Sequence, residues 1–218
     1  RPSNAFNGIN FAALNKTNGE RAAFIPENDF LVEIDFKAYH PTIIAKLAGY
    51  EFTGNIYEQL ANEFSGSTPE TIKELVFQQL YGGVRKEFQD KPFFKQVNDF
   101  VYSLWSKWKT NGYIKTPILK RQLSKDSLSD MNQNKLFNYY LQALETEFTA
   151  NRLYQLSGLL EKYKTCITLY TYDSVLFDVP IHEAKEILPQ IKLQLEEDNF
   201  PVKCKVGNIY SKMNDIKL

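Results

Sequence analysis

The sequence is poor in the residues that form covalent or metal cross-links. It has two cysteines, Cys166 and Cys204, and two histidines among 218 residues. None of these four residues stands at the spacing of zinc ligands, so a structural zinc site is not expected. Two cysteines are also too few for the disulfide framework of a small secreted protein, and we expect both to be reduced residues in core strands.

The sequence also lacks an excess of charge of either sign and lacks long hydrophobic runs. Its 26 Lys and Arg residues balance 26 Asp and Glu residues, so the chain as a whole does not attract nucleic acid. Any such binding must come from local basic clusters set against aromatic residues, such as Arg85-Lys86, Lys107 with Lys109, and the stretch from Lys115 to Lys125. A solvated face is the alternative for any one cluster. No run of 18 apolar residues occurs, so no membrane span is expected.

Two aspartates in short apolar strands, far apart in the chain, are the most informative feature present. Asp35 lies in the strand predicted over Phe30–Phe36, and Asp173 lies in a hairpin predicted from strands over 165–172 and 175–179. A carboxylate is costly to bury unless positive charge compensates it. If the strands meet in one sheet, two Mg²⁺ ions would remove the repulsion and form a site for phosphoryl transfer. For either aspartate alone, a turn or edge position is the commoner explanation.

A helix predicted over 68–80 carries the second signal. Thr68 is a good N-cap, Pro69 suits the first helical position, and the two glycines after Tyr81 end the helix. Lys73, Phe77 and Tyr81 follow at i, i+4 and i+8 and so lie along one face. A cation, a phenyl ring and a phenol in a row suit a triphosphate, a base and a sugar. An aromatic stripe that is simply core is the usual alternative, but it does not explain the lysine, unless its stem snorkels.

These residues match the motifs of a known family. The segment Asp35–Pro41 resembles a strand aspartate that turns into a helix, and Lys73, Phe77, Tyr81 and Gly82 keep the spacing of a second, helical motif. The segment Tyr172–Ser174 resembles a hairpin that usually reads His-Asp-Glu. In this order the three motifs resemble the polymerase region of family A DNA polymerases, the group of bacterial DNA polymerase I and related phage replicases.

The resemblance extends over nearly the whole chain. The segment 1–10 is similar to the start of the family's palm, and Gly112–Thr116 with Lys120-Arg121 is similar to its Gly-Tyr-Val-x-Thr … Arg-Arg stretch. Asn138 and Gln142 keep the spacing of two residues that touch primer-template DNA, and 201–210 resembles the closing strand.

Hydrophobic periodicity predicts an antiparallel sheet backed by helices, an α+β fold, with a helical insertion. Residues 10–13 and 22–25 are expected to pair as a hairpin around Asn18-Gly19, and Val202–Val206 is expected to be an edge strand. In the family these parts are the palm and the fingers. The resemblance therefore implies palm over 1–50, fingers over 51–130 and the second part of the palm over 131–218.

The resemblance implies template-directed DNA synthesis, the transfer of nucleotides from dNTPs to a primer 3′-OH. Two Mg²⁺ ions, for which Mn²⁺ can substitute, would be held by Asp35, the Phe36 carbonyl and Asp173, and Lys73 would contact the triphosphate and assist the leaving group. Residues expected to contact the incoming nucleotide are Lys73, Phe77, Tyr81, Tyr39 and His40. Residues expected to contact primer-template DNA are Arg1, Arg121, Asn138 and Gln142.

Three positions depart from the family pattern. His40 replaces an acidic residue that screens the sugar 2′-OH, Pro69 replaces a phosphate-binding arginine, and Ser174 replaces the hairpin glutamate. The alternatives are an RNA-synthesising or reverse-transcribing relative, a family B-like polymerase, and a degenerate domain that binds nucleic acid without catalysis. We expect this chain to be a fragment that has an upstream thumb or exonuclease segment, or a separate accessory chain, as its partner. The expected location is the cytoplasm of a bacterium or of a phage-infected cell.

Overall fold

The computed structural model describes residues 10–15, 19–64 and 67–218. The chain divides into a first compact unit, Arg1–Lys37 with Thr149–Leu218, and a second, Ala38–Phe148. The palm and fingers bounds expected near residues 50 and 130 stay a prediction. Within the second unit α1 (Tyr39–Ala48) packs on α4 (Pro92–Asn111), and α5 (Gln133–Leu160) is one continuous helix whose residues fall in both units.

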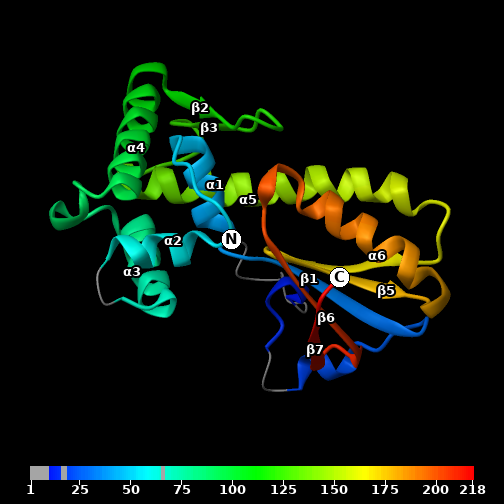
Figure 1. The fold of residues 1–218 in the computed structure, drawn as a ribbon. Helices are drawn as coiled ribbons and strands as arrows, with labels where there is room; N and C mark the ends of the chain where they lie inside the picture. Colours follow the sequence, from blue (N-terminus) through cyan, green and yellow to red (C-terminus); the bar gives the residue numbers. More distant parts are fainter. Residues whose placement is uncertain (1–9, 16–18, 65–66) are drawn as a thin grey trace. The chain divides into compact units, whose positions relative to one another are not determined.

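The first unit is built on a five-stranded antiparallel sheet with the strand order β4-β5-β1-β6-β7 (Figure 1). Its strands are β1 (Phe30–Phe36), β4 (Cys166–Thr171), β5 (Ser174–Val179), β6 (Val202–Ile209) and β7 (Lys212–Ile216). All of β5 and most of β1 are buried, as expected of apolar strands covered on both faces. The prediction of an α+β fold with an antiparallel sheet is confirmed.

Helices cover one face of this sheet. Figure 1 shows α6 (Ile181–Leu195) lying over the sheet, and its buried residues are Ile187, Leu188, Ile191 and Leu195. The last part of α5 runs beside α6, since the side chains of Gln155 and Gln194 form a hydrogen bond of 2.9 Å. The rings of Phe36 and Phe200 pack edge to face with their centroids 6.2 Å apart. This ring contact anchors the end of β1, next to Asp35.

The opposite face carries a smaller apolar cluster. Its buried members are Leu31, Leu176 and Tyr210, and Phe24, Leu169 and Met213 pack against them. Two short 3-10 helices, η1 (Phe11–Ala13) and η2 (Glu20–Ala23), contact β4 and β6. The hairpin predicted for this segment is therefore wrong, and Asn18 lies outside the described residues. A tertiary bond from Tyr210 N to Phe24 O, 3.0 Å long, helps to hold the segment instead.

The second unit consists of helices and a small hairpin. Its elements are α1, α2 (Ile56–Glu63), α3 (Pro69–Gly82), η3 (Lys86–Phe88), α4, β2 (Tyr113–Lys115), β3 (Gln122–Ser124) and the first part of α5. α3 begins as its sequence predicts, because the Thr68 hydroxyl accepts from Thr71 N at 3.3 Å and Pro69 is the first helical residue. It ends before Gly83, whose φ of 91° and closeness to Asn134 leave no room for a side chain.

Two further expectations need correction. β6 is not an edge strand, because it pairs with β1 on one side and β7 on the other. The sequence of β7 is too polar to be recognised as a strand by periodicity. Both cysteines are free and Cys204 is buried, but Cys166 is exposed because it opens the edge strand β4. In the described part of the chain, no helix combines the length and the apolar character needed to cross a bilayer.

Candidate functional site

The two aspartates singled out in the sequence lie at adjacent positions in the first unit. Asp35, near the end of β1, pairs with Ser174, the first residue of β5. The Phe36 N–H donates to the carbonyl oxygen of Asp173 at 2.8 Å, so the two motif segments are hydrogen-bonded directly. Asp35 is half-buried and Asp173 is exposed. Both aspartates therefore stand at the same end of neighbouring strands, the placement that a shared site requires.

The hairpin between β4 and β5 presents Asp173 through a tight turn. Tyr172 has a φ of 52°, in the left-handed region that residues with side chains rarely adopt. The Asp173 N–H donates to the Thr171 carbonyl at 2.6 Å, which closes a three-residue turn. Such a backbone costs on the order of 1–3 kcal/mol and persists only where the surrounding structure holds it. Here β4 and β5 hold it, and Asp173 is exposed beside the tip.

A buried carboxylate that the sequence analysis did not single out lies near this edge. Glu33 is 5% exposed and stands two residues before Asp35, on the same face of β1. Its Oε1 accepts from the Tyr210 hydroxyl at 2.8 Å and from the Ser174 hydroxyl at 3.4 Å. Two cations compensate its charge, Arg21 at 3.7 Å and Lys205 at 3.6 Å. Its position as a second charged residue in a mainly apolar strand could have indicated Glu33 in the sequence.

The hydroxyl groups around Glu33 extend this polar network. The Thr171 and Ser174 hydroxyls are 2.5 Å apart and both residues are buried. Burial raises the pKa of Tyr210, and the neighbouring Glu33 raises it further, so this phenol keeps its proton as the donor to Glu33. The position at which the family has a third carboxylate is thus occupied by a serine that contacts a carboxylate on the next strand.

The predicted row on α3 lies in the second unit. Lys73 and Phe77 are exposed and Tyr81 is half-buried. The rings of Phe77 and Tyr81 stack, with centroids 5.7 Å apart and planes 23° from parallel. The helix therefore offers an exposed cation followed by a pair of stacked rings.

The Tyr81 hydroxyl is hydrogen-bonded to His40 of α1, through Nδ1 of the imidazole. On its other side, His40 Nε2 lies 3.2 Å from Oε2 of Glu145 in α5, a close contact that is not aligned as a hydrogen bond. The Tyr39 hydroxyl donates to the backbone carbonyl of Glu145 at 3.4 Å. The structure thus brings together Tyr39, His40 and Tyr81, which the sequence analysis named, and adds Glu145, which it missed. No spacing in the sequence could have linked residues so far apart in the chain.

Two asparagines of α5 bind the end of α3. Asn134 Nδ2 donates to the Gly82 carbonyl at 2.8 Å, and Asn138 Nδ2 donates to the Tyr81 carbonyl at 3.3 Å. These are carbonyls that a helix end leaves without partners of its own. Asn138 Oδ1 is buried and has no hydrogen-bond partner within the described ranges. One half of this side chain therefore supports α3, and its oxygen is enclosed without a protein partner among the described residues.

The basic clusters predicted to attract nucleic acid carry cations placed over aromatic rings. The distances from the cation to the ring centroid are 5.0 Å for Arg85 over Phe88, 5.8 Å for Lys109 over Trp105, 5.6 Å for Lys115 over Tyr113 and 5.4 Å for Lys125 over Trp108. Where the ring is accessible, such pairs combine a positive charge with a surface on which bases can stack, but Trp108 is buried and offers no such surface.

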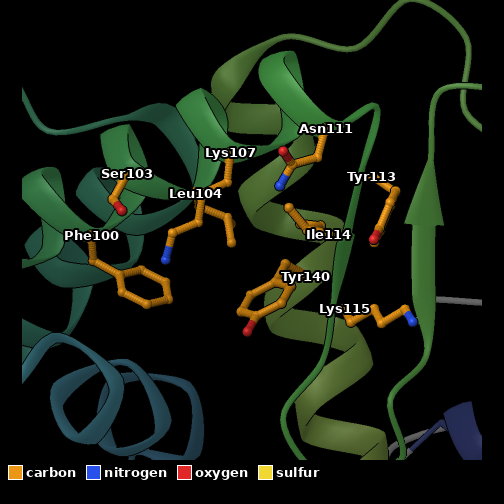
Figure 2. Close-up of a pocket in the computed structure, with 9 residues that line it drawn as sticks. All are labelled: Phe100, Ser103, Leu104, Lys107, Asn111, Tyr113, Ile114, Lys115 and Tyr140. Atoms are coloured by element: carbon orange, nitrogen blue, oxygen red, sulfur yellow. The ribbon is translucent and has the colours of Figure 1, made fainter.

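A cavity of about 280 Å³ lies among α4, β2 and α5, beside two of these clusters. Figure 2 shows its lining residues: Phe100, Ser103, Leu104, Lys107, Asn111, Tyr113, Ile114, Lys115 and Tyr140. Lys107, Lys115 and Tyr113 are exposed, and none of the lining residues is acidic. The cavity is therefore chemically suited to an anionic ligand with an aromatic part.

The other described residues predicted to contact DNA do not line this cavity. Arg121 is exposed in the stretch before β3, where its carbonyl accepts from Thr116 N at 3.0 Å. Gln142 is half-buried in α5, one turn after Asn138. Arg1 lies outside the described residues.

The donors near Asp35 fit a hard cation, since carboxylate and carbonyl oxygens are the ligands that Mg²⁺ prefers. Two carboxylates and the Phe36 carbonyl are the groups that this edge offers. Within the described ranges, no group of three or more His, Cys, Asp or Glu side chains is arranged to hold a metal ion. Further ligands for an ion at this edge would have to come from a substrate or from water.

The comparisons with known proteins bear on the fold. No protein-family model and no curated protein matches the chain. Among solved structures, it is similar to the polymerase domain of Pol1 from M. smegmatis in complex with a DNA primer-template and a dNTP. The TM-score is 0.71 and the sequences are 17% identical, over 88% of this chain and 42% of that one. The chain thus spans less than half the length of this neighbour, and it has the fold of a Pol1-type polymerase domain.

Proposed function

We propose that this chain catalyses template-directed DNA synthesis, adding nucleotides from dNTPs to a primer 3′-OH. The observation that carries the proposal is that Asp35 and Asp173 lie at the same end of neighbouring strands, in a chain with the fold of a polymerase domain. The resemblance of the three motifs to family A polymerases supports the same reaction.

In this reaction Asp35, Asp173 and the Phe36 carbonyl would hold two Mg²⁺ ions. When bound, such ions activate the 3′-OH and neutralise the charge that develops on the leaving group. The 3′ oxygen forms a new bond to the α-phosphorus, the bond to the β-phosphate oxygen breaks, and pyrophosphate leaves. The tight turn at Tyr172 and the strand pairing of Asp35 keep the two carboxylates in place through this step.

The residues of α3 bind and orient the nucleotide. Lys73 is exposed and cationic, so it pairs with the triphosphate and can donate a proton to the leaving pyrophosphate. The stacked rings of Phe77 and Tyr81 offer a flat surface to the base and a phenol to the sugar.

Primer-template DNA is the proposed partner. The side chain of Asn138, which is half-buried, would contact a base edge or a sugar, as the motif resemblance implies. Gln142 lies one turn further along α5, and Arg1 and Arg121 supply cations. The basic clusters over aromatic rings would hold the backbone and bases of single-stranded template. An upstream thumb or exonuclease segment, or an accessory chain, would complete the grip on the duplex.

Primer extension on a labelled primer-template tests the proposal. Extension is measured with dNTPs and with NTPs, in Mg²⁺ and in Mn²⁺, for the parent chain and for Asp173→Asn. Since Asp173 is exposed, its substitution leaves the fold intact, and we expect extension to fall by about 100-fold or more when a catalytic carboxylate is lost. Asp215→Asn, which changes an exposed carboxylate of β7, serves as the matched control and should extend at the parental rate.

The outcomes separate the candidate functions. Extension by the parent with dNTPs, lost in Asp173→Asn alone, supports DNA synthesis. Faster extension with NTPs favours the RNA-synthesising alternative, which the replacement of an acidic residue by His40 makes a specific candidate. Equal extension by the parent and Asp173→Asn would refute the role of the two aspartates.

A further inference from the structure

The second unit contains a buried chain of three polar side chains that ends at the nucleotide-facing row of α3. It runs from Glu145 in α5 through His40 in α1 to the hydroxyl of Tyr81 in α3. His40 is 3% exposed and Glu145 is 2% exposed. A buried carboxylate is costly unless its neighbours compensate it, and the His40 imidazole is one such neighbour.

The chemistry of the contacts decides where the protons lie. A carboxylate only accepts hydrogen bonds, so the Glu145 oxygen, 3.2 Å from His40 Nε2, favours the tautomer with the proton on Nε2. Nδ1 of the neutral ring then carries a lone pair and accepts from the Tyr81 hydroxyl. The phenol proton is thereby directed at His40 and away from any ligand.

The remaining contacts restrict the Tyr81 ring. Its face stacks on Phe77, with centroids 5.7 Å apart, and its edge meets the His40 ring at a centroid distance of 5.9 Å. The backbone carbonyl of Tyr81 accepts from Asn138. The phenol therefore directs its proton at His40, and its ring is held between those of Phe77 and His40.

We propose that Glu145 and His40 are positioning residues that lock the Tyr81 phenol, and that Glu145 thereby sets how strictly the sugar of the nucleotide is read. This inference rests on the proposed function, in which Tyr81 faces the sugar. A phenol that is fixed and has committed its proton cannot make room for a 2′-OH or donate to it, so ribose is excluded. The strictness of this exclusion depends on a carboxylate that the nucleotide does not touch.

The first test needs no activity. The chain has two histidines, and His182, with a side chain 66% exposed, is an internal reference for His40. Long-range ¹H–¹⁵N correlation spectra report which ring nitrogen carries the proton. We expect His40 to carry it on Nε2 in the parent and to lose this preference in Glu145→Gln, because an amide can present either a donor or an acceptor. A proton on Nδ1 in the parent would overturn the inference, whatever the variants do.

The second test measures the ratio of incorporation efficiencies for a dNTP and the matching NTP. Glu145→Gln should lower this ratio by about threefold to tenfold, because it frees His40 to change tautomer and so to lose the hydrogen bond from Tyr81. In a Tyr81→Phe background, which removes the hydroxyl, the same substitution should leave the ratio unchanged. A carboxylate with a merely structural role would not show this coupling in a double-mutant cycle.

Glu147→Gln is the matched control. Glu147 is also a buried carboxylate of α5, but it accepts from the Thr116 hydroxyl at 2.6 Å and from Leu119 N at 3.0 Å, not from His40. Its substitution should leave the ratio at the parental value. If the parent incorporates nucleotides and Glu145→Gln leaves the ratio unchanged, the inference is overturned while the proposed function stands. If the parent incorporates neither sugar, both are overturned.

Discussion

Glu33 gives the sharpest prediction about stability in the first unit. Replacing Glu33 by leucine keeps most of the side-chain volume and removes the buried charge of β1. The Tyr210 hydroxyl then stays buried without its acceptor, which costs about 1–3 kcal/mol. Arg21 and Lys205 lose their counter-charge, but their side chains are 14% and 29% exposed. Both cations still reach solvent in part, and Arg21 also lies over the Tyr210 ring, so we take each of these two losses as about 0.5–1 kcal/mol.

The new leucine would offset part of this cost. It would pack near Leu31 and Leu176, and the apolar contact returns about 1 kcal/mol. The net loss is about 1–4 kcal/mol, with a central value of about 2.5 kcal/mol. For a chain of this size each kcal/mol lowers the melting temperature by about 2–4 °C, so Glu33→Leu should melt about 5–10 °C below the parent.

Thermal unfolding followed by far-UV circular dichroism measures this change. Glu33→Gln keeps an acceptor for Tyr210 and loses only the charge, so its melting temperature should lie between those of the parent and Glu33→Leu. Asp215→Leu is the control, because the carboxylate of Asp215 is 65% exposed and its pair with Lys203 contributes at most about 0.5 kcal/mol. If Glu33→Leu melts within one or two degrees of the parent, roughly the uncertainty of such a measurement, the polar network does not stabilise the sheet as reasoned here.

Three further predictions follow from the second unit. Lys73→Ala should slow single-turnover dNTP incorporation roughly 10- to 150-fold, since a charge-assisted phosphate contact is worth about 1.5–3 kcal/mol. Primer-template affinity should be unchanged, and equal incorporation rates in the parent and the variant would contradict this role of Lys73. Lys115→Ala should lower the number of ions released on binding of single-stranded DNA by about one. Tyr113→Ala should weaken this binding by about 1–3 kcal/mol and leave the salt dependence unchanged. Binding titrations at several salt concentrations test both, and curves identical to those of the parent would rule out this surface. Burial and the hydrogen bond to Glu63 raise the pKa of Tyr50 from 10.0 to about 12, so the stability that its proton confers is complete below pH 10 and is lost as the pH rises through 12. Tyr50→Phe should flatten the fall in stability between pH 10 and 12 in urea titrations, and an undiminished fall would show that another group is responsible.

Local sequence determined the elements whose signals are short-range. α3 begins at Pro69 behind the Thr68 cap and ends before Gly83, because capping and positive φ are decided within a few residues. The strand over Phe30–Phe36 was predicted with its bounds for the same reason, since an apolar run of this length has few alternatives. The same rules failed for residues 10–25, where local signals are weak and the chain is held by contacts such as Tyr210 N to Phe24 O.

Tertiary structure alone decided which side chains meet. Asp35 and Asp173 were named from the sequence, but the pairing of Asp35 with Ser174 is a matter of strand register, and a slip of one residue would turn the side chains to the other face. Glu33 meets Ser174 and Tyr210 from sequence separations of 141 and 177 residues, and Glu145 reaches His40 from a different helix. Helix caps and hydrophobic periods are local and can be read along the chain. Partners for buried charges are chosen by packing, because the cost of leaving such a charge unpaired is felt only once the chain has closed around it.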